Sequence, residues 1–305
     1  MRKLSKQAFQ GATNWILKNG RPLEQATIKH SFMDGTTESI LNALEKYQNE
    51  NGGFGHGLEA DFRLPDSSSL ATTVAMQHLI HFGQLEKADE MITKAIQYFE
   101  QSYNEKRGGW YAVPEAVNDY PHAFWWTVHE DGMSWIDHNW GNPSAEIIGY
   151  LVKYQTKVQQ LDVKKLLDQA INHLLSLEKF ESEHEIYCYI RLFHLCPEYE
   201  TAKVKQQLER AATSLVQYES SKWKEYVPSP LKFVHTPGGN SYGIPLEEVN
   251  KNLNYLVEQL ETNGVLKPNW EWNDNLDVWE QAKEEWTGVL TLDTLETLRR
   301  FGRID

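Results

Sequence analysis

Residues 47–54 read YQNENGGF, and residues 103–110 read YNEKRGGW. Each stretch begins with a tyrosine and ends in a Gly-Gly-aromatic turn at the same offset. The spacing between the two copies is long enough for two helices and their connections. Such a period is typical of arrays in which helical hairpins follow one another. The repeat therefore favours a chain built from paired helices.

Hydrophobic periodicity supports the same interpretation. Within 37–48, Ile40, Leu41 and Leu44 fall on one face of a helix. No two alternating runs are joined by a hairpin turn, so a large sheet is not expected. We expect an all-α fold in a single domain spanning 1–305. Further helices are predicted at 7–18, 69–82, 85–103, 145–156, 161–177, 184–195, 199–218, 246–261 and 291–301.

Charge and cysteine content exclude several classes of protein. The net charge of −13 argues against nucleic acid and anionic lipid as partners, because both require clustered Lys and Arg. Cys188 and Cys196 are too few for a disulfide framework or a four-cysteine zinc site. No segment reaches the roughly 20 apolar residues that span a bilayer, and the N-terminus lacks a signal-peptide core. We expect a cytoplasmic protein with buried thiols and no membrane span, and no feature indicates its oligomeric state.

Four long connections separate the predicted helices. They are rich in Gly, Pro, His, acids and Trp, and they hold most of the 11 tryptophans. Long loops inside a compact fold are usually functional, and disordered segments avoid tryptophan. We expect ordered loops that gather at one end of a helical barrel. The connections are 49–68, 108–142, 221–245 and 263–290.

The first of these loops carries a dense group of polar residues beside a glycine-rich turn. His56, Glu59 and Asp61 are candidate catalytic acids and bases, because three titratable groups lie within six residues. Arg63 and Asp66 are candidate substrate contacts. The alternative is structural: Arg63 pairs with a carboxylate, and Asp66 or a neighbouring serine caps the next helix.

The second loop adds imidazoles, acids and aromatic rings. Indole faces can stabilise a carbocation by about 2 kcal/mol when desolvated, or can stack on sugar rings. The alternative is that these rings pack between helices with their polar tips hydrogen-bonded. The candidate catalytic residues here are His129, Glu130, Asp131, Asp137 and His138. The candidate substrate-binding rings are Trp125, Trp126 and Trp140, with Trp270 and Trp272 near the C-terminus.

The same loop contains side chains of the kinds that bind metals. Their spacing matches no standard zinc pattern. We therefore predict no cofactor, and a divalent metal at His129, Asp131, Asp137 and His138 is the less favoured alternative.

Part of the chain resembles a known superfamily. Gln48, the turn 52–54 and the small-residue helix 71–75 (ATTVA) resemble a repeat of the protein prenyltransferase β subunits and the squalene–hopene-type cyclases. Residues 108–110 match the turn only. The resemblance to this terpenoid cyclase and prenyltransferase superfamily implies an α/α toroid, about six helix pairs around a central cavity.

The catalytic motifs of these families are missing from the chain. The Asp-x-Cys pair of the zinc-dependent prenyltransferases is absent, and so is the Asp-x-Asp-Asp motif of the class II cyclases. The nearest approaches are Glu59-Ala-Asp61 and the stretch 273–277, NDNLD. The resemblance thus implies a divergent member, since a fold does not by itself fix an activity.

Three functions remain open on the sequence. The favoured hypothesis is an enzyme with its site in the central cavity, using acid/base chemistry on an isoprenoid-like small molecule. The first alternative is a carbohydrate-active enzyme, a glycoside hydrolase or lyase on an α/α barrel. The second alternative is a non-catalytic helical scaffold that binds a peptide or small molecule.

Overall fold

A computed structural model describes residues 1–304 of the chain. Over these residues the protein has eleven α-helices and no β-strand, which confirms the prediction of an all-α fold. The helices are α1 (Lys6–Asn19), α2 (Pro22–Phe32), α3 (Thr37–Glu45), α4 (Ser69–Leu79), α5 (Glu86–Ser102), α6 (Gly141–Lys153), α7 (Val163–Ser176), α8 (Glu183–Leu195), α9 (Ala202–Leu215), α10 (Leu246–Asn263) and α11 (Leu276–Arg300).

The helices fall into two compact units, and the boundaries between the units lie within α3 and within α9. Unit 1 comprises Met1–Ala43, Ala212–Trp272 and Leu276–Asp305. Unit 2 comprises Leu44–Ala211 and the short piece Asn273–Asn275. The single domain and the closed ring of helix pairs stay predictions.

In unit 1, α1 packs against α2, α10 and α11. The hydroxyl of Ser5 accepts a hydrogen bond from the backbone N–H of Ala8 and caps α1, a contact worth about 1 kcal/mol. Ile16 of α1 and Leu298 of α11 are fully buried in this core. A Cβ on Gly288 would lie 3.5 Å from the Cα of Gly20, an ordinary van der Waals distance. The middle of α11 therefore lies against the end of α1.

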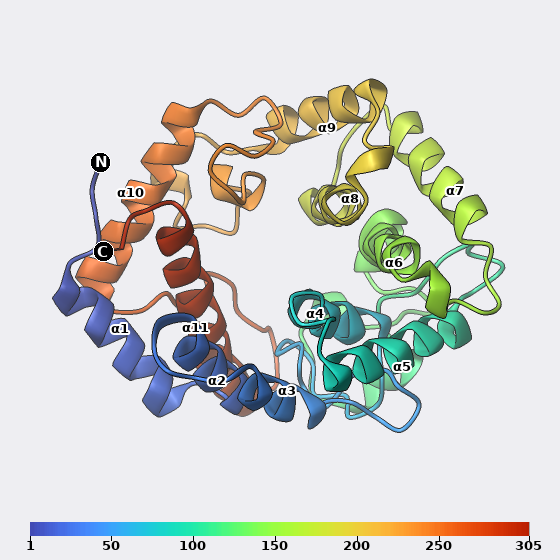
Figure 1. Cartoon of the computed structure of the whole chain (residues 1–305), viewed down its shortest axis with the longest axis horizontal. Coiled ribbons are helices and arrows are strands. Elements are labelled where there is room, and N and C mark those ends of the chain that lie inside the picture. Colours follow the sequence, from blue (N-terminus) through green and yellow to red (C-terminus); the bar gives the residue numbers. More distant parts are fainter. Residues whose placement is uncertain (305) are drawn as a thin grey trace. The chain divides into compact units, whose positions relative to one another are not determined.

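In unit 2, α6 lies at the centre, with α4, α5, α7 and α8 packed around it (Figure 1). Every residue of α6 from Gly141 to Leu151 is buried. A helix that is buried on every side must carry apolar side chains, or polar side chains that find hydrogen-bond partners within the protein. Gly149 allows the two backbones to approach closely, because a Cβ there would lie 3.0 Å from the Cα of Leu192 in α8. The packing of α6 against α8 is thus the central helix contact of this unit.

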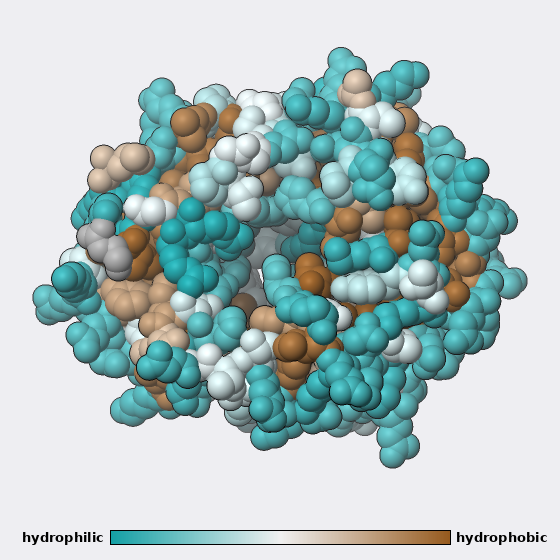
Figure 2. Space-filling model, viewed as in Figure 1, coloured by the Kyte–Doolittle hydropathy of each residue, from teal (hydrophilic) through white to brown (hydrophobic). Residues whose placement is uncertain are grey.

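Hydrophilic residues predominate on the face shown in Figure 2, where hydrophobic residues form smaller separate areas. The buried hydrophobic side chains lie within the two helical cores instead. No helix within residues 1–304 combines the length and the apolar character needed to cross a bilayer.

Candidate functional site

Both Gly-Gly-aromatic turns are hydrogen-bonded in the same way to the start of a helix of unit 2. The backbone N–H of Phe54 donates to Oγ1 of Thr72 in α4 over 3.0 Å, and the N–H of Trp110 donates to Oγ of Ser144 in α6 over 3.0 Å. Each hydroxyl belongs to the fourth residue of its helix. The first glycine of each Gly-Gly pair has a positive φ, 88° at Gly52 and 64° at Gly108. Glycine adopts such a backbone angle more readily than any other residue. The sequence repeat therefore has a structural role: it places an aromatic residue beside the first turn of a helix.

Hydrogen bonds connect the N-terminal ends of α4, α6 and α8 through the long loop. Leu70 N–H at the start of α4 donates to the carbonyl of Ala112, and Ala112 N–H donates to Oδ1 of Asp137 over 2.8 Å. At the start of α6, Gly141 N–H donates to Oε1 of Glu185 in α8 over 2.7 Å. Helix N-termini carry a partial positive charge, and the Gly141 N–H opposes in part the rise in the pKa of Glu185 that burial causes.

The structure brings the two candidate loop segments together. Arg63 N–H donates to the carbonyl of Pro121, and Ala123 N–H donates to the carbonyl of Asp61, both over 2.8 Å. These two bonds pair the segment after the first glycine-rich turn with the start of the tryptophan-rich segment. The pairing brings the backbone that carries Glu59 and Asp61 beside the backbone that leads to Trp125 and Trp126.

Glu59 and Asp61 are buried carboxylates at this pairing, with exposed fractions of 8% and 5%. Oε1 of Glu59 accepts a hydrogen bond from the backbone N–H of Asp61 over 3.3 Å. Nearby, the ring of Phe62 meets the edge of Trp126 with 5.4 Å between centroids. Nε1 of Trp126 is buried and has no hydrogen-bond partner within the described residues, although a buried indole N–H usually has one. The site thus contains two buried carboxyl groups and an aromatic pair, Phe62 and Trp126. The indole N–H of Trp126 has no hydrogen-bond acceptor within the described residues.

Asp137 stabilises the long loop. Its Oδ2 accepts from both the N–H and the hydroxyl of Ser134, over 2.8 and 2.6 Å, while Oδ1 accepts from Ala112. Arg107 lies 3.9 Å away and donates to the Asp137 carbonyl over 2.7 Å. These contacts make Asp137 a positioning residue of the loop, and its predicted catalytic role stays a prediction.

The remaining candidate acids and bases are exposed. His56 has a positive φ of 55°, and its Nε2 lies 2.8 Å from Oδ1 of Asn49, so the ring is held at the loop surface. Oδ1 of Asp131 accepts from the backbone N–H of Met133 over 3.0 Å. These side chains therefore face solvent, unlike the carboxyl groups of Glu59 and Asp61. The exposed candidates are His56, Asp66, His129, Glu130, Asp131 and His138.

The candidate tryptophans divide between the two units. Trp125 contacts Phe124 in unit 2. Trp140, in the same unit, lies 4.8 Å from the ring of His173. Trp270 and Trp272 belong to unit 1. There the ring of Trp270 contacts those of Tyr226 and Trp286, and the ring of Trp272 contacts Trp279.

A buried polar network on α4, α6 and α8 was not predicted as a site. Glu146, only 2% exposed, accepts hydrogen bonds from Gln77 over 2.9 Å and from the hydroxyl of Tyr150 over 2.6 Å. Arg191 donates to the other carboxylate oxygen over 3.1 Å. Burial, together with the nearby Glu146 charge, raises the pKa of Tyr150 well above its ordinary value. These hydrogen bonds tie the three helices together. Only the spacing of four residues between Glu146 and Tyr150 is visible in the sequence.

A second unpredicted group lies where α7 meets α8. Nδ1 of His173 lies 2.8 Å from the hydroxyl of Tyr189 and 3.9 Å from Oε1 of Glu185. Burial lowers the pKa of His173 and raises the pKa of Glu185, so the two groups favour their neutral forms. The sequence holds no local signal for this group, because its members come from different helices.

Metal-binding side chains do not cluster in the part of the chain that the structure describes: no group of three or more His, Cys, Asp or Glu residues there could hold an ion. Comparison of the chain with protein-family models, curated proteins and solved structures found no significant match. The resemblance to the terpenoid cyclase and prenyltransferase superfamily therefore rests on the sequence motifs alone.

Proposed function

We propose that this protein is an enzyme of the terpenoid cyclase and prenyltransferase type, an α/α toroid of about six helix pairs, that acts on an isoprenoid-like small molecule. The observation that carries the proposal is the pair Glu59 and Asp61. These two carboxylates are more than nine-tenths buried and lie on a loop that pairs with the segment bearing Trp126. Buried acids beside aromatic rings are a frequent sign of an active site.

The chemistry follows from the residue types. A carboxyl group can give its proton to a carbon–carbon double bond, whose π electrons form the new C–H bond and leave a cation on the neighbouring carbon. The faces of Trp126 and Phe62 can stabilise such a cation by about 2 kcal/mol once water is excluded. The second carboxylate can then remove a proton from the adjacent carbon and restore a double bond. Glu59 and Asp61 would divide these two roles.

Carbohydrate chemistry is the second candidate, and a separate observation favours it. Trp135 and Phe124, on the long loop of unit 2, are 61% and 43% exposed. Solvent-facing aromatic rings suit the apolar faces of sugar rings, and paired carboxyl groups are the standard machinery of glycoside hydrolysis. An oligosaccharide that binds at this loop would favour this candidate over the isoprenoid.

The test is a binding and turnover screen with farnesyl diphosphate, geranylgeranyl diphosphate, squalene and a set of oligosaccharides. A specific ligand raises the apparent melting temperature of the folded protein. We expect an isoprenoid probe to give this rise and to yield a new product by mass spectrometry. Asp61→Asn should lower product formation by about a hundredfold or more, the usual contribution of a general acid or base.

Glu50→Gln is the matched control, because Glu50 is exposed in the same loop. It should leave binding and turnover unchanged. Trp126→Phe should weaken binding without removing either acid. Absence of binding and conversion for every isoprenoid probe, or an Asp61→Asn variant as active as the parent, would overturn the proposal.

A further inference from the structure

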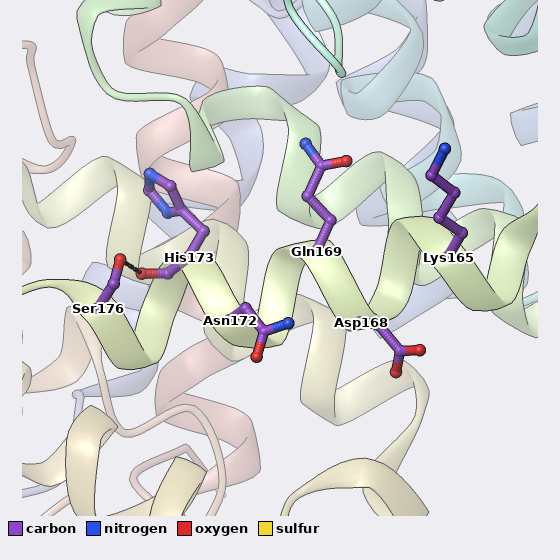
Figure 3. Close-up of a pocket in the computed structure, with 6 residues that line it drawn as sticks. All are labelled: Lys165, Asp168, Gln169, Asn172, His173 and Ser176. Carbon is purple, nitrogen blue, oxygen red and sulfur yellow. Dashed lines mark hydrogen bonds between the residues drawn. The ribbon is translucent and has the colours of Figure 1, made fainter.

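His173 connects α7 to the start of α6 through two residues of α8. Its ring projects from α7 (Figure 3), and Nδ1 lies 2.8 Å from the hydroxyl of Tyr189 and 3.9 Å from Oε1 of Glu185. The same oxygen of Glu185 accepts the hydrogen bond from the backbone N–H of Gly141 over 2.7 Å. One carboxylate oxygen thus faces both a titratable ring and the first N–H of α6.

The position of His173 lets a change of its charge act on this contact. The side chain is 30% exposed, so protons reach it from solvent, whereas that of Glu185 is only 6% exposed. The titratable groups that face the ring are Glu185 and Tyr189 of α8, and the charge of Arg107 acts on Glu185. The segment before α6 meets the ring through the uncharged Trp140, at 4.8 Å between centroids. Along its own segment, the residues three and four positions from His173 are also uncharged: Gln169, Ala170, Ser176 and Leu177.

Uptake of one proton by His173 and Glu185 weakens the bond to Gly141, whichever of the two holds the proton. A neutral imidazole accepts at one nitrogen, but an imidazolium donates at both, so Nδ1 then attracts the Glu185 carboxylate. With the proton on Glu185 instead, the neutral carboxyl group accepts a weaker hydrogen bond. Two groups this close titrate as a pair. Protonation of the pair therefore loosens the N–H of Gly141 in both cases.

The direction of the pH dependence follows from burial. Burial lowers the pKa of His173 below its ordinary value of 6.5. When Gly141 leaves Glu185 and the ring reaches water, the ring regains that ordinary pKa, so the open form binds more protons than the closed form. Opening therefore becomes easier as the pH falls from 6.5 towards the lowered pKa. The raised pKa of Glu185 acts in the opposite sense, from its own folded value down to 4.5.

We propose that His173 and Glu185 make the start of α6 a pH-sensitive contact, closed on Gly141 at neutral pH and loosened by a proton in mildly acidic solution. Trp140 directly precedes Gly141, and its ring lies against His173, so the loosening reaches the end of the long loop. The inference does not rest on the proposed function, because it uses neither Glu59 nor Asp61.

Hydrogen exchange of the Gly141 amide, followed by NMR in the full-length protein at pH 7.5 and 6.0, tests the proposal. Protection is compared after correction for the intrinsic pH dependence of exchange. It should fall by about two- to fourfold at pH 6.0, the range that linkage allows for a histidine whose open form has its ordinary pKa. The Leu70 amide is the internal reference, because it donates to the backbone carbonyl of Ala112, which does not titrate. Its protection should stay constant.

Two substitutions at position 173 reproduce the two charge states. His173→Gln keeps a donor and an acceptor without a charge, so the pH dependence of Gly141 should disappear. His173→Lys is charged at both pH values, so protection should be low already at pH 7.5. His184→Gln is the matched control, because Nε2 of His184 also lies 3.9 Å from a carboxylate, that of Glu183, but its side chain is 42% exposed. This variant should respond as the parent does, and circular dichroism checks that each variant folds.

Three results would overturn the proposal. The first is a parent protein in which the protection of Gly141 does not change between the two pH values. The second is an equal loss of protection at Leu70, which would show a general effect of acid on unit 2. The third is a His173→Gln variant that keeps the response of the parent. The first two are read on the parent alone, so they do not depend on whether a variant folds.

Discussion

Glu185 in α8 accepts a hydrogen bond from the backbone N–H of Gly141, the first residue of α6, over 2.7 Å. The first N–H groups of a helix have no partner within that helix, so the carboxylate of one helix caps the next. A Cβ at position 141 would lie 2.9 Å from Oε1 of Glu185 and 2.7 Å from Cε2 of Tyr189. Glycine is therefore required for the close contact, which fixes α6 and α8 at the end that carries the candidate site.

Glu185→Gln should make the protein more stable at neutral pH. Burial raises the pKa of this carboxyl above its ordinary value of 4.5, and the Gly141 N–H and Arg107 oppose the rise only in part. Between the unfolded pKa and the raised folded pKa, the folded chain holds more protons than the unfolded chain, so stability falls as pH rises. The glutamine can still accept the hydrogen bond from the Gly141 N–H. Because glutamine does not ionise, the variant does not lose stability in this way as the pH rises. Urea unfolding at pH 4.5 and 7.5 should show a larger gain for the variant at the higher pH.

Glu181→Gln is the control for this experiment, because Glu181 is exposed just before the same helix. It should change stability little at either pH. The prediction is wrong if Glu185→Gln destabilises the protein more at pH 7.5 than at pH 4.5. In that case the folded protein stabilises the ionised form of Glu185.

Gly55→Ala should destabilise the loop that carries Glu59 and Asp61. A Cβ at position 55 would lie 2.2 Å from the carbonyl oxygen of Asp66 and 2.3 Å from that of Pro65. Both atoms are backbone and cannot turn away, so the loop must move, at a cost of about 2 kcal/mol or more. The measurement is the midpoint of urea unfolding.

Gly11→Ala is the matched substitution for comparison. Gly11 lies inside α1, and a Cβ there would meet nothing within 4 Å. Alanine is the better helix former, so this variant should gain about 0.5–1 kcal/mol. Equal effects of the two substitutions would show that the tight packing around Gly55 does not constrain the loop.

The sequence predicted the local features of the fold well. The two Gly-Gly-aromatic turns are visible because each is a short motif whose glycine needs a positive φ. By contrast, α2 was missed, because its buried Glu24 pairs with Arg21 and interrupts the apolar face. The first half of α11 was expected to be part of the loop 263–290, because this stretch is rich in tryptophan and acidic residues.

The candidate site was predictable only in part. Both loop segments stood out by composition, but the pairing of Asp61 with Ala123 joins residues far apart in the chain. The contact between Glu146 and Arg191 likewise forms between two helices. Nothing in either local sequence marks such a partner, because the contact depends on how helices pack and not on a motif.

The two cysteines should not react in the native protein. Cys188 and Cys196 are 3% and 1% exposed. Burial raises the pKa of Cys196 to about 11 and that of Cys188 further still. Since the thiolate is the reactive form, only about one Cys196 thiol in a thousand is ionised at pH 8. A thiol reagent such as dithionitrobenzoate should label neither cysteine until urea is added, and rapid labelling without urea would contradict this burial.

Arg303→Met should destabilise unit 1. The Arg303 side chain is only 1% exposed and joins the N-terminal segment to α10. It donates to the carbonyl of Arg2 over 2.8 Å and to the side-chain oxygens of Asn254 and Asn250 over 2.9 and 2.7 Å. Methionine fills similar space but leaves three acceptors without a donor, at about 1 kcal/mol or more for each. We expect a loss of about 3 kcal/mol in urea unfolding.

Arg300→Met tests whether this loss belongs to the buried position. Arg300 is exposed at the end of α11, three residues before Arg303, and the same substitution there should cost less than about 0.5 kcal/mol. Arg303 is buried and makes three hydrogen bonds, whereas Arg300 is exposed, so the two variants should differ by most of the predicted loss. If both lower the unfolding midpoint equally, loss of positive charge near the C-terminus is the cause, and the hydrogen bonds of Arg303 contribute little.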